Sequence, residues 1–176
     1  RTPLLTTTWN QGVYYNSMCP YDGNYHEHSA TGCVATATAQ IMKYWNWPAN
    51  GYGSHSYNHN SFGTLNANFG ATTYDWNNMP DELSTNSSAT EINAIATLMY
   101  HIGVAIEMNY GVSATGGSNA HSYSTLGEID ASSQHALIKY FKYSPDMQVL
   151  SQAEYSTDGW KAVLMLELDQ NRPILY

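Results

Sequence analysis

Residues 33–45 constrain the fold of this chain more than any other segment. They read CVATATAQIMKYW and contain one charged residue, Lys43. Apolar side chains recur at helical spacing, namely Val34, Ala37, Ile41 and Trp45, with Ala35, Ala39 and Met42 beside them. Pro48 and Gly51 follow and end the predicted helix. A helix so rich in alanine and so poor in charge is expected to be buried on most of its sides.

Three further helices are predicted. Ser88 and Glu91 form a capping box, and the helix behind it carries Ile92, Ile95, Leu98, Met99 and Ile102, with Gly103 near its end. A helix over 132–142 would turn Ala136, Leu137, Tyr140 and Phe141 inward, and another over 157–170 would place Trp160, Val163, Leu164 and Leu168 on one side. These segments predict a fold in which helices supply most of the core.

The remaining segments are predicted to have little regular structure. Residues 1–32 are interpreted as irregular, and residues 49–79 as a long loop with short extended pieces, because both are rich in turn formers. Residues 111–122 form a glycine-rich loop. Residues 172–176, RPILY, are interpreted as an apolar strand that enters a core. Since an apolar strand needs partners, we expect further sequence to belong to this domain.

Composition narrows the class of protein. The chain has 176 residues, enough for one domain with a core, and 43% of them are hydrophobic. Only 11% are charged, so neutral polar side chains must cover the surface, as is common in secreted proteins. The formal net charge is −8 with six Lys and Arg residues. This leaves no electrostatic footprint for nucleic acid and no basic cluster for an anionic membrane, and no apolar run is long enough to span a bilayer.

Cys33 is the strongest candidate for chemistry. It follows Gly32 and begins the predicted helix, where the unpaired N–H groups and the positive end of the helix dipole favour a thiolate over a thiol. Gly32 lets backbone approach a substrate closely, and the Cys33 N–H is placed to donate to an oxyanion. The structural alternative is a small buried side chain at the start of a helix, which is the commoner role of a free cysteine.

Two other residues, Gln11 and Cys19, are considered for chemistry beside Cys33. Gln11 offers a neutral side-chain N–H donor, although on its own it is an ordinary loop residue. Cys19 precedes Pro20 and no helix, so we interpret it as a bystander. A single disulfide between the two cysteines is the alternative to two free thiols.

Several stretches together resemble the streptopain family of cysteine peptidases. They are Gln11, the run from Thr31 to Tyr44, Tyr74–Pro80, Met108–Gly111 and Asn171–Tyr176, in the order in which the family has them. The resemblance implies an α+β, papain-like fold of which residues 1–176 form the helical, nucleophile-bearing part. It implies that Cys33 is the nucleophile and Gln11 the oxyanion-hole glutamine. It also implies that the loop around Gly116, with Ser113 and Thr115, lines the substrate cleft.

The resemblance carries further expectations. Members are secreted as zymogens with an inhibitory N-terminal propeptide, need no cofactor or metal, and cleave proteins with a preference for an apolar residue two positions before the scissile bond. The family histidine comes shortly after the strand that Ile174–Tyr176 resembles. We therefore expect residues 1–176 to be a single incomplete peptidase domain, with the histidine and the C-terminal sheet region on a segment after residue 176.

Seven histidines lie within the chain, and we interpret all of them as structural or surface residues. His26 and His28 form a weak metal-binding pattern, because a zinc site needs three or four ligands. Three functions thus remain at this point: a cysteine endopeptidase, a non-catalytic binding module on a degenerate peptidase scaffold, and a metal-dependent protein using these two histidines. Intact Cys33 and Gln11 favour the first.

Overall fold

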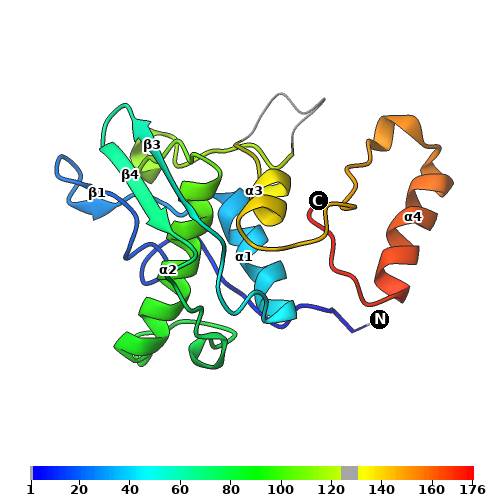
Figure 1. Ribbon diagram of the computed structural model, residues 1–176, viewed down its shortest axis with the longest axis horizontal. Coiled ribbons are helices and arrows are strands. Elements are labelled where there is room, and N and C mark those ends of the chain that lie inside the picture. Colours follow the sequence, from blue (N-terminus) through cyan, green and yellow to red (C-terminus); the bar gives the residue numbers. More distant parts are fainter. Residues whose placement is uncertain (1, 124–130) are drawn as a thin grey trace.

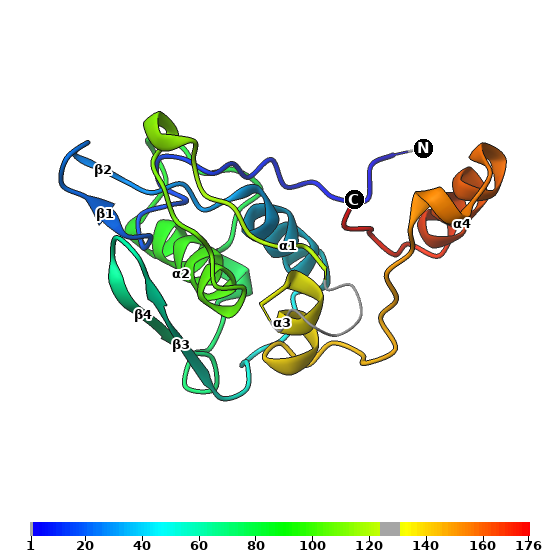
Figure 2. The same ribbon diagram turned by 90° about the horizontal axis from the view of Figure 1, so that it is seen from above.

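The computed structural model describes residues 2–123 and 131–176 (Figure 1). Its elements, in chain order, are β1 Tyr21–Asp22, β2 Glu27–His28, α1 Cys33–Trp45, β3 Ser54–His59, β4 Gly63–Asn68, α2 Ala89–Ala105, α3 Ser133–Lys139 and α4 Thr157–Asp169, with short 3-10 helices at Trp76–Asn78, Ser113–Thr115 and Gln152–Glu154. Figures 1 and 2 show α1, α2, α3 and the β3–β4 hairpin gathered in one body, with α4 set apart at one end.

Helix α1 has the predicted bounds, and it packs against α2 and α3. The side of α1 that is buried differs from the predicted stripe. Ala35, Ala39 and Met42 are fully buried, whereas Trp45 is 47% exposed. Small side chains on the buried side let the neighbouring helices approach closely, and the Thr38 hydroxyl lies 2.5 Å from the Ser133 hydroxyl of α3. The expectation of burial on most sides is met in part, because the fully buried residues of α1 lie on one side while most of the others are half-buried.

Helix α2 is the centre of the core. The predicted capping box is confirmed: the Glu91 N–H donates to the Ser88 hydroxyl, and the Ser88 N–H donates to the Glu91 carboxylate at 2.7 Å. Of its predicted apolar residues, four are completely buried: Ile95, Leu98, Met99 and Ile102. A Cβ at Gly103 would overlap the hydroxyl of Tyr110, so this glycine lets Tyr110 pack directly on the helix.

The segment predicted as a long loop, residues 49–79, contains a hairpin. β3 and β4 pair antiparallel, with a register that runs from Ser54 opposite Asn68 to His59 opposite Gly63. The hairpin packs on α2 (Figure 2), and its buried residues are His59, Leu65 and Ala67. The short extended pieces predicted in this loop are thus present, but their pairing as a hairpin was not predicted, because most positions of both strands are polar and leave almost no apolar alternation.

Helix α3 is shorter than the predicted 132–142, but all four predicted inward residues of that segment are buried. Beyond it lies the C-terminal arm, defined here as residues 148–176, which contains α4. Every residue of the arm is described, and Trp160 is the one that is buried. Its ring lies beside those of Tyr155 and Tyr176, at centroid distances of 5.6 and 6.2 Å. The arm therefore packs largely on itself.

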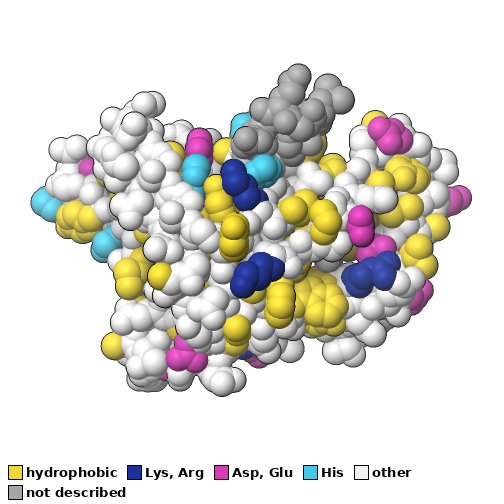
Figure 3. Space-filling model, in the orientation of Figure 1, with side chains coloured by type: hydrophobic (Ala, Val, Ile, Leu, Met, Phe, Trp, Pro, Cys, Tyr) yellow, Lys and Arg dark blue, Asp and Glu magenta, His cyan; other side chains and the backbone are white. Residues whose placement is uncertain are grey.

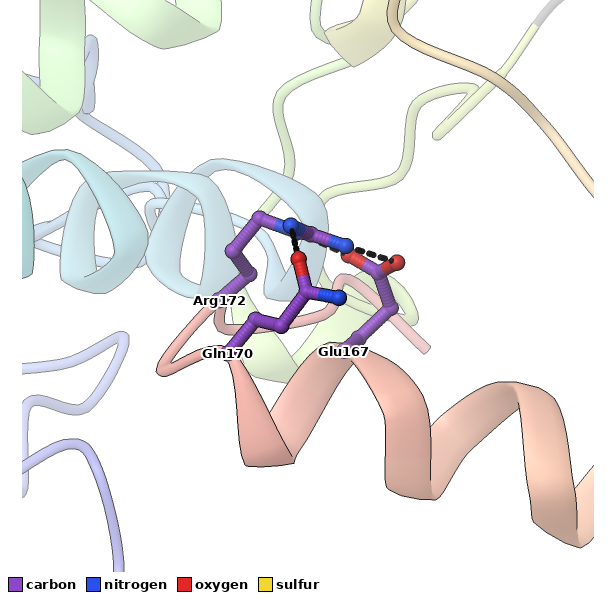
Figure 4. Close-up of polar contacts among 3 residues, drawn as sticks. All are labelled: Glu167, Gln170 and Arg172. Atoms are coloured by element: carbon purple, nitrogen blue, oxygen red, sulfur yellow. Dashed lines mark hydrogen bonds and ion pairs between the residues drawn. The ribbon is translucent and has the colours of Figure 1, made fainter.

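The predicted strand over 172–176 is wrong, since these residues form no strand. Arg172 instead folds back on α4, where its guanidinium donates two hydrogen bonds of 2.6 Å to the Glu167 carboxylate and a third to the Gln170 side-chain oxygen (Figure 4). Tyr44 of α1 donates to the Asn171 carbonyl at 3.0 Å. A strand needs a neighbouring strand to satisfy its backbone, and no strand of the described residues lies beside this segment.

Among the described residues, no helix has the length and apolar character to cross a membrane. Lys and Arg side chains are few and scattered on the face drawn in Figure 3, in keeping with the formal charge of −8.

Candidate active site

Cys33 is the first residue of α1 and is exposed. The N-cap before it is Gly32, in a conformation with a φ of 87° that favours glycine, so no side chain caps the first turn. Space also demands glycine here, because a Cβ would come within 2.7 Å of the Met108 sulfur and still closer to its methyl carbon. The start of the helix thus presents an exposed thiol, and no side chain caps the backbone N–H groups of its first turn.

Cys19 lies in a different environment. The two cysteines are free thiols, so the alternative of a disulfide between them is not realised. Cys19 is 3% exposed within the core, and burial raises the pKa of its thiol to about 12. A thiol that is both buried and protonated at neutral pH is a poor nucleophile. Its placement agrees with the interpretation of Cys19 as a bystander.

Gln11 lies in an exposed loop next to the segment that leads into α1. Its backbone carbonyl accepts a hydrogen bond of 3.1 Å from the N–H of Thr31, two residues before Cys33. The turn is fixed locally, because the Gly12 N–H donates to the Asn10 side-chain oxygen at 2.9 Å. The structure therefore holds the backbone of Gln11 beside the segment that leads into Cys33, although the two segments are far apart in the sequence.

The glycine-rich loop lies beside the same segment. Ser113–Thr115 form a single 3-10 turn that ends at Gly116, where φ is 100°, and all of these residues are exposed. The loop is joined to the nucleophile segment by the Ala30 N–H, which donates to the Gly111 carbonyl at 3.1 Å. Ser118 adds a second link, since its hydroxyl donates to the Ala30 carbonyl at 2.6 Å. Sequence analysis missed Ser118, because a serine in a polar loop carries no distinguishing signal.

Three of the seven histidines have hydrogen-bond partners other than Cys33. The Nδ1 of His28 lies 2.6 Å from the Cys19 carbonyl oxygen, and the Nε2 of His55 lies 2.9 Å from the Glu107 carboxylate. His101 is buried, with its Nδ1 3.0 Å from the Tyr74 hydroxyl, and burial lowers the pKa of its ring to about 4. Each of these three histidines thus has a hydrogen-bond partner other than Cys33.

The metal hypothesis has no support from the geometry around His26 and His28. His26 occupies the turn between β1 and β2, with a φ of 56°, whereas the ring of His28 faces the Cys19 carbonyl. Over residues 2–123 and 131–176, no group of three or more His, Cys, Asp or Glu side chains is arranged to hold a metal ion.

Two surface hollows lie away from these residues. One of about 300 Å³ is lined by polar side chains of the segment before α2 and of α2 itself, among them Asp75 and Asn93. Another of about 260 Å³ lies between the N-terminal segment and α1, beside Lys43 and Asp81. Neither hollow is lined by Cys33, Gln11 or the glycine-rich loop. The candidate site therefore consists of three adjoining surface segments: the Gln11 loop, the start of α1 and the glycine-rich loop.

Comparison with known proteins shows the family of the chain. The pattern of the Peptidase C10 family matches residues 9–176. Streptopain of Streptococcus pyogenes is 32% identical over 183 aligned residues, which cover 96% of this chain and 43% of streptopain. The thiol protease/hemagglutinin PrtT of Porphyromonas gingivalis is 30% identical over 99% of this chain and 18% of its own length. The chain thus spans less than half the length of these relatives.

Solved structures show the same likeness. Active interpain A, a cysteine protease of Prevotella intermedia, superposes with a TM-score of 0.84 and 39% identity, over 97% of this chain and 66% of its own. A prointerpain A fragment from the same organism superposes with a TM-score of 0.81 over 51% of its length. The predicted α+β, papain-like fold and the predicted streptopain kinship are both confirmed, and the chain belongs to the Peptidase C10 family.

Proposed function

We propose that residues 1–176 form the nucleophile-bearing part of a cysteine endopeptidase that acts on protein and peptide substrates. The observation that carries the proposal is the contrast between the two thiols: Cys33 is exposed at the uncapped start of α1, whereas Cys19 is buried in the core. An exposed thiol at a helix N-terminus is the arrangement in which cysteine acts as a nucleophile. Membership of a family whose relatives include named thiol and cysteine proteases supports it.

The proposed reaction is acyl transfer in two steps. The Cys33 thiolate attacks the carbonyl carbon of the scissile peptide bond, and the oxyanion that forms accepts hydrogen bonds from the Cys33 N–H and the Gln11 side-chain amide. Collapse of this intermediate breaks the C–N bond, and an imidazolium donates a proton to the leaving amine. Water then hydrolyses the thioester and restores the thiol. Ser113, Thr115 and Gly116 are proposed to line the cleft that holds the substrate.

The imidazole is proposed to come from a segment beyond residue 176. Support for this comes from three of the resident histidines, since His28, His55 and His101 contact groups other than Cys33. The relatives are longer than this chain, which leaves room in them for such a segment.

Regulation and location are proposed in the same way. An N-terminal propeptide would keep the enzyme inactive before maturation, and a fragment of prointerpain A is among the similar structures. Secretion would suit a chain in which only 11% of residues are charged, so that neutral polar side chains cover much of the surface. A non-catalytic binding module is the second candidate, and the observation that favours it is that His28, His55 and His101 contact groups other than Cys33.

Substitution of the two cysteines in the full-length enzyme tests the proposal. Cys33→Ala should abolish peptide hydrolysis without changing the thermal unfolding midpoint, because a methyl group cannot attack a carbonyl and the side chain is exposed. Cys19→Ala is the matched control and should keep most of the activity of each folded molecule. Turnover that survives in Cys33→Ala would contradict the assignment of Cys33 as nucleophile, whereas absence of turnover in the wild type would favour the binding module.

A further inference from the structure

The segment before Cys33 lies between two loops that sequence analysis assigned to different tasks. Thr31 donates its N–H to the Gln11 carbonyl, and Ala30 donates its N–H to the Gly111 carbonyl, each at 3.1 Å. Two neighbouring residues, Ala30 and Thr31, thus hold the glycine-rich loop and the loop of Gln11, respectively. These few backbone contacts therefore set the spacing between the segment before Cys33 and the two loops.

Ser118 completes the contact on the substrate side. Its hydroxyl oxygen accepts from the Gly111 N–H at 3.0 Å and donates to the Ala30 carbonyl at 2.6 Å. The Gly111 carbonyl is also near, at 3.2 Å, but a hydroxyl has one proton and Ala30 is the closer acceptor. Ala30 and Gly111 are thus linked twice, once directly and once through the Ser118 hydroxyl.

Close packing on both sides leaves this link little freedom. A Cβ at Gly32 would lie within 3.4 Å of the Ser118 Cβ as well as against Met108. A Cβ at Gly111 would lie 2.7 Å from the Gly117 carbonyl oxygen and 3.1 Å from the Thr115 hydroxyl. Glycine at position 32 thus lets the nucleophile segment approach Met108 and Ser118 closely, whereas glycine at position 111 lets the glycine-rich loop fold on itself. The Ser118 hydroxyl bridges Ala30 of the segment and Gly111 of the loop.

We propose that Ser118 is a positioning residue, whose hydroxyl fixes the glycine-rich loop against the segment that leads into Cys33. The inference rests on the proposed function, because its consequence is the alignment of a bound peptide with the thiol. Misplacement of a substrate by about 1 Å costs on the order of 10²-fold in rate. The hydrogen bonds of Ser118 go to Ala30 and Gly111, so the intrinsic reactivity of the Cys33 thiol should not depend on Ser118.

Variants of the full-length enzyme separate these effects. Ser118→Ala should lower kcat/KM for a peptide by about 10- to 100-fold, mainly in kcat. The rate at which iodoacetamide alkylates Cys33 should stay within about twofold, since this small reagent does not use the loop. Ser118→Thr, which keeps the hydroxyl, should restore most of the turnover. Ser54→Ala removes an exposed serine at the start of β3 and should behave as wild type.

Amide hydrogen exchange at Gly111 gives a readout that does not need catalysis. The Gly111 N–H is bonded to the Ser118 hydroxyl, so its exchange should accelerate in Ser118→Ala and recover in Ser118→Thr. Unchanged exchange would overturn the proposal whatever the turnover. So would unchanged kcat/KM, or a fall in alkylation that matches the fall in turnover. Absence of turnover in the wild type would instead contradict the proposed function, and exchange at Gly111 would still decide whether Ser118 holds the two segments together.

Discussion

Helices α2 and α4 carry similar apolar patterns but have different surroundings. In α2, nine residues are buried, and Ile95, Leu98, Met99 and Ile102 have no exposed surface. In α4, only Trp160 is buried, while Met165 and Leu166 are 46% and 55% exposed. Helical periodicity predicts that a helix forms, but the stability of the helix comes from what packs on its apolar side. The body should therefore unfold as one unit, and the arm should open at much lower cost.

Truncation of matched leucines should give the largest difference between the two regions. Leu98→Ala removes a fully buried side chain and should lower the free energy of unfolding by about 3 kcal/mol, because it leaves a cavity in the core. Leu166→Ala should change it by less than about 0.5 kcal/mol. Urea denaturation followed by tryptophan fluorescence measures both. Equal losses would mean that α4 is as well packed as α2 in solution.

The proposed site lies in the body, so substitutions in the site should change activity, whereas substitutions in the arm should not. Gln11→Ala should lower kcat of the full-length enzyme by about 10²-fold, the usual effect of losing one oxyanion donor, while KM changes less. Gln152→Ala, at an exposed glutamine of the arm, is the control and should leave both parameters unchanged. If Gln11→Ala altered KM alone, Gln11 would be a substrate-binding residue.

Acid should weaken the body through His101. The pKa of this buried ring is about 4 in the folded state, below the value near 6.5 in an unfolded chain. Between these values the unfolded state binds a proton that the folded state does not, so stability is complete above about pH 6.5 and falls as the pH drops toward 4. Because of this residue, the free energy of unfolding measured by chemical denaturation should be about 2 kcal/mol lower at pH 5 than at pH 7.

The control for this pH effect is His101→Gln, which should show a correspondingly smaller difference between the two pH values. His26→Gln, at an exposed turn, should keep the wild-type difference. The arm contains no histidine, so amide exchange in α4 should lack this dependence. A full pH effect in His101→Gln would assign it to other groups.

Helix caps should give the smallest effects. Ser88→Ala removes the capping box of α2 and should cost about 1 kcal/mol of global stability. Ser156 caps α4 by accepting from the Gly159 N–H at 3.1 Å. Because α4 contributes little to the core, Ser156→Ala should speed exchange of amides in the first turn of α4 without moving the global transition. A global loss in Ser156→Ala similar to that in Ser88→Ala would remove the distinction between arm and body.

Local signals in the sequence were sufficient for the helices. The bounds of α1, the capping box at Ser88 and the inward residues of α2 and α3 all follow from periodicity and end signals. Short extended pieces were predicted where β3 and β4 lie, but their pairing was not, because the hairpin is held by tertiary packing on α2 and its strands are mostly polar. The strand predicted over 172–176 failed for a related reason, since an apolar run forms a strand only beside a partner.

Prediction of the site divides in the same way. The placement of Cys33 at a helix start and the turn around Gly116 are local features that the sequence carries. The hydrogen bond from Thr31 to Gln11 and the two links between Ala30 and the glycine-rich loop join distant segments. No pattern in a single sequence marks such pairs, so Ser118 emerged only from the structure.

Trapping of a covalent intermediate tests the central claim most directly. The full-length enzyme would be mixed with an activated ester of a blocked amino acid, quenched in acid within its first turnover, and digested for mass spectrometry. The proposed mechanism predicts one acyl group per active molecule, attached as a thioester to the peptide that contains Cys33. An acyl group on Cys19 or on a hydroxyl side chain, or turnover without any covalent intermediate, would contradict it.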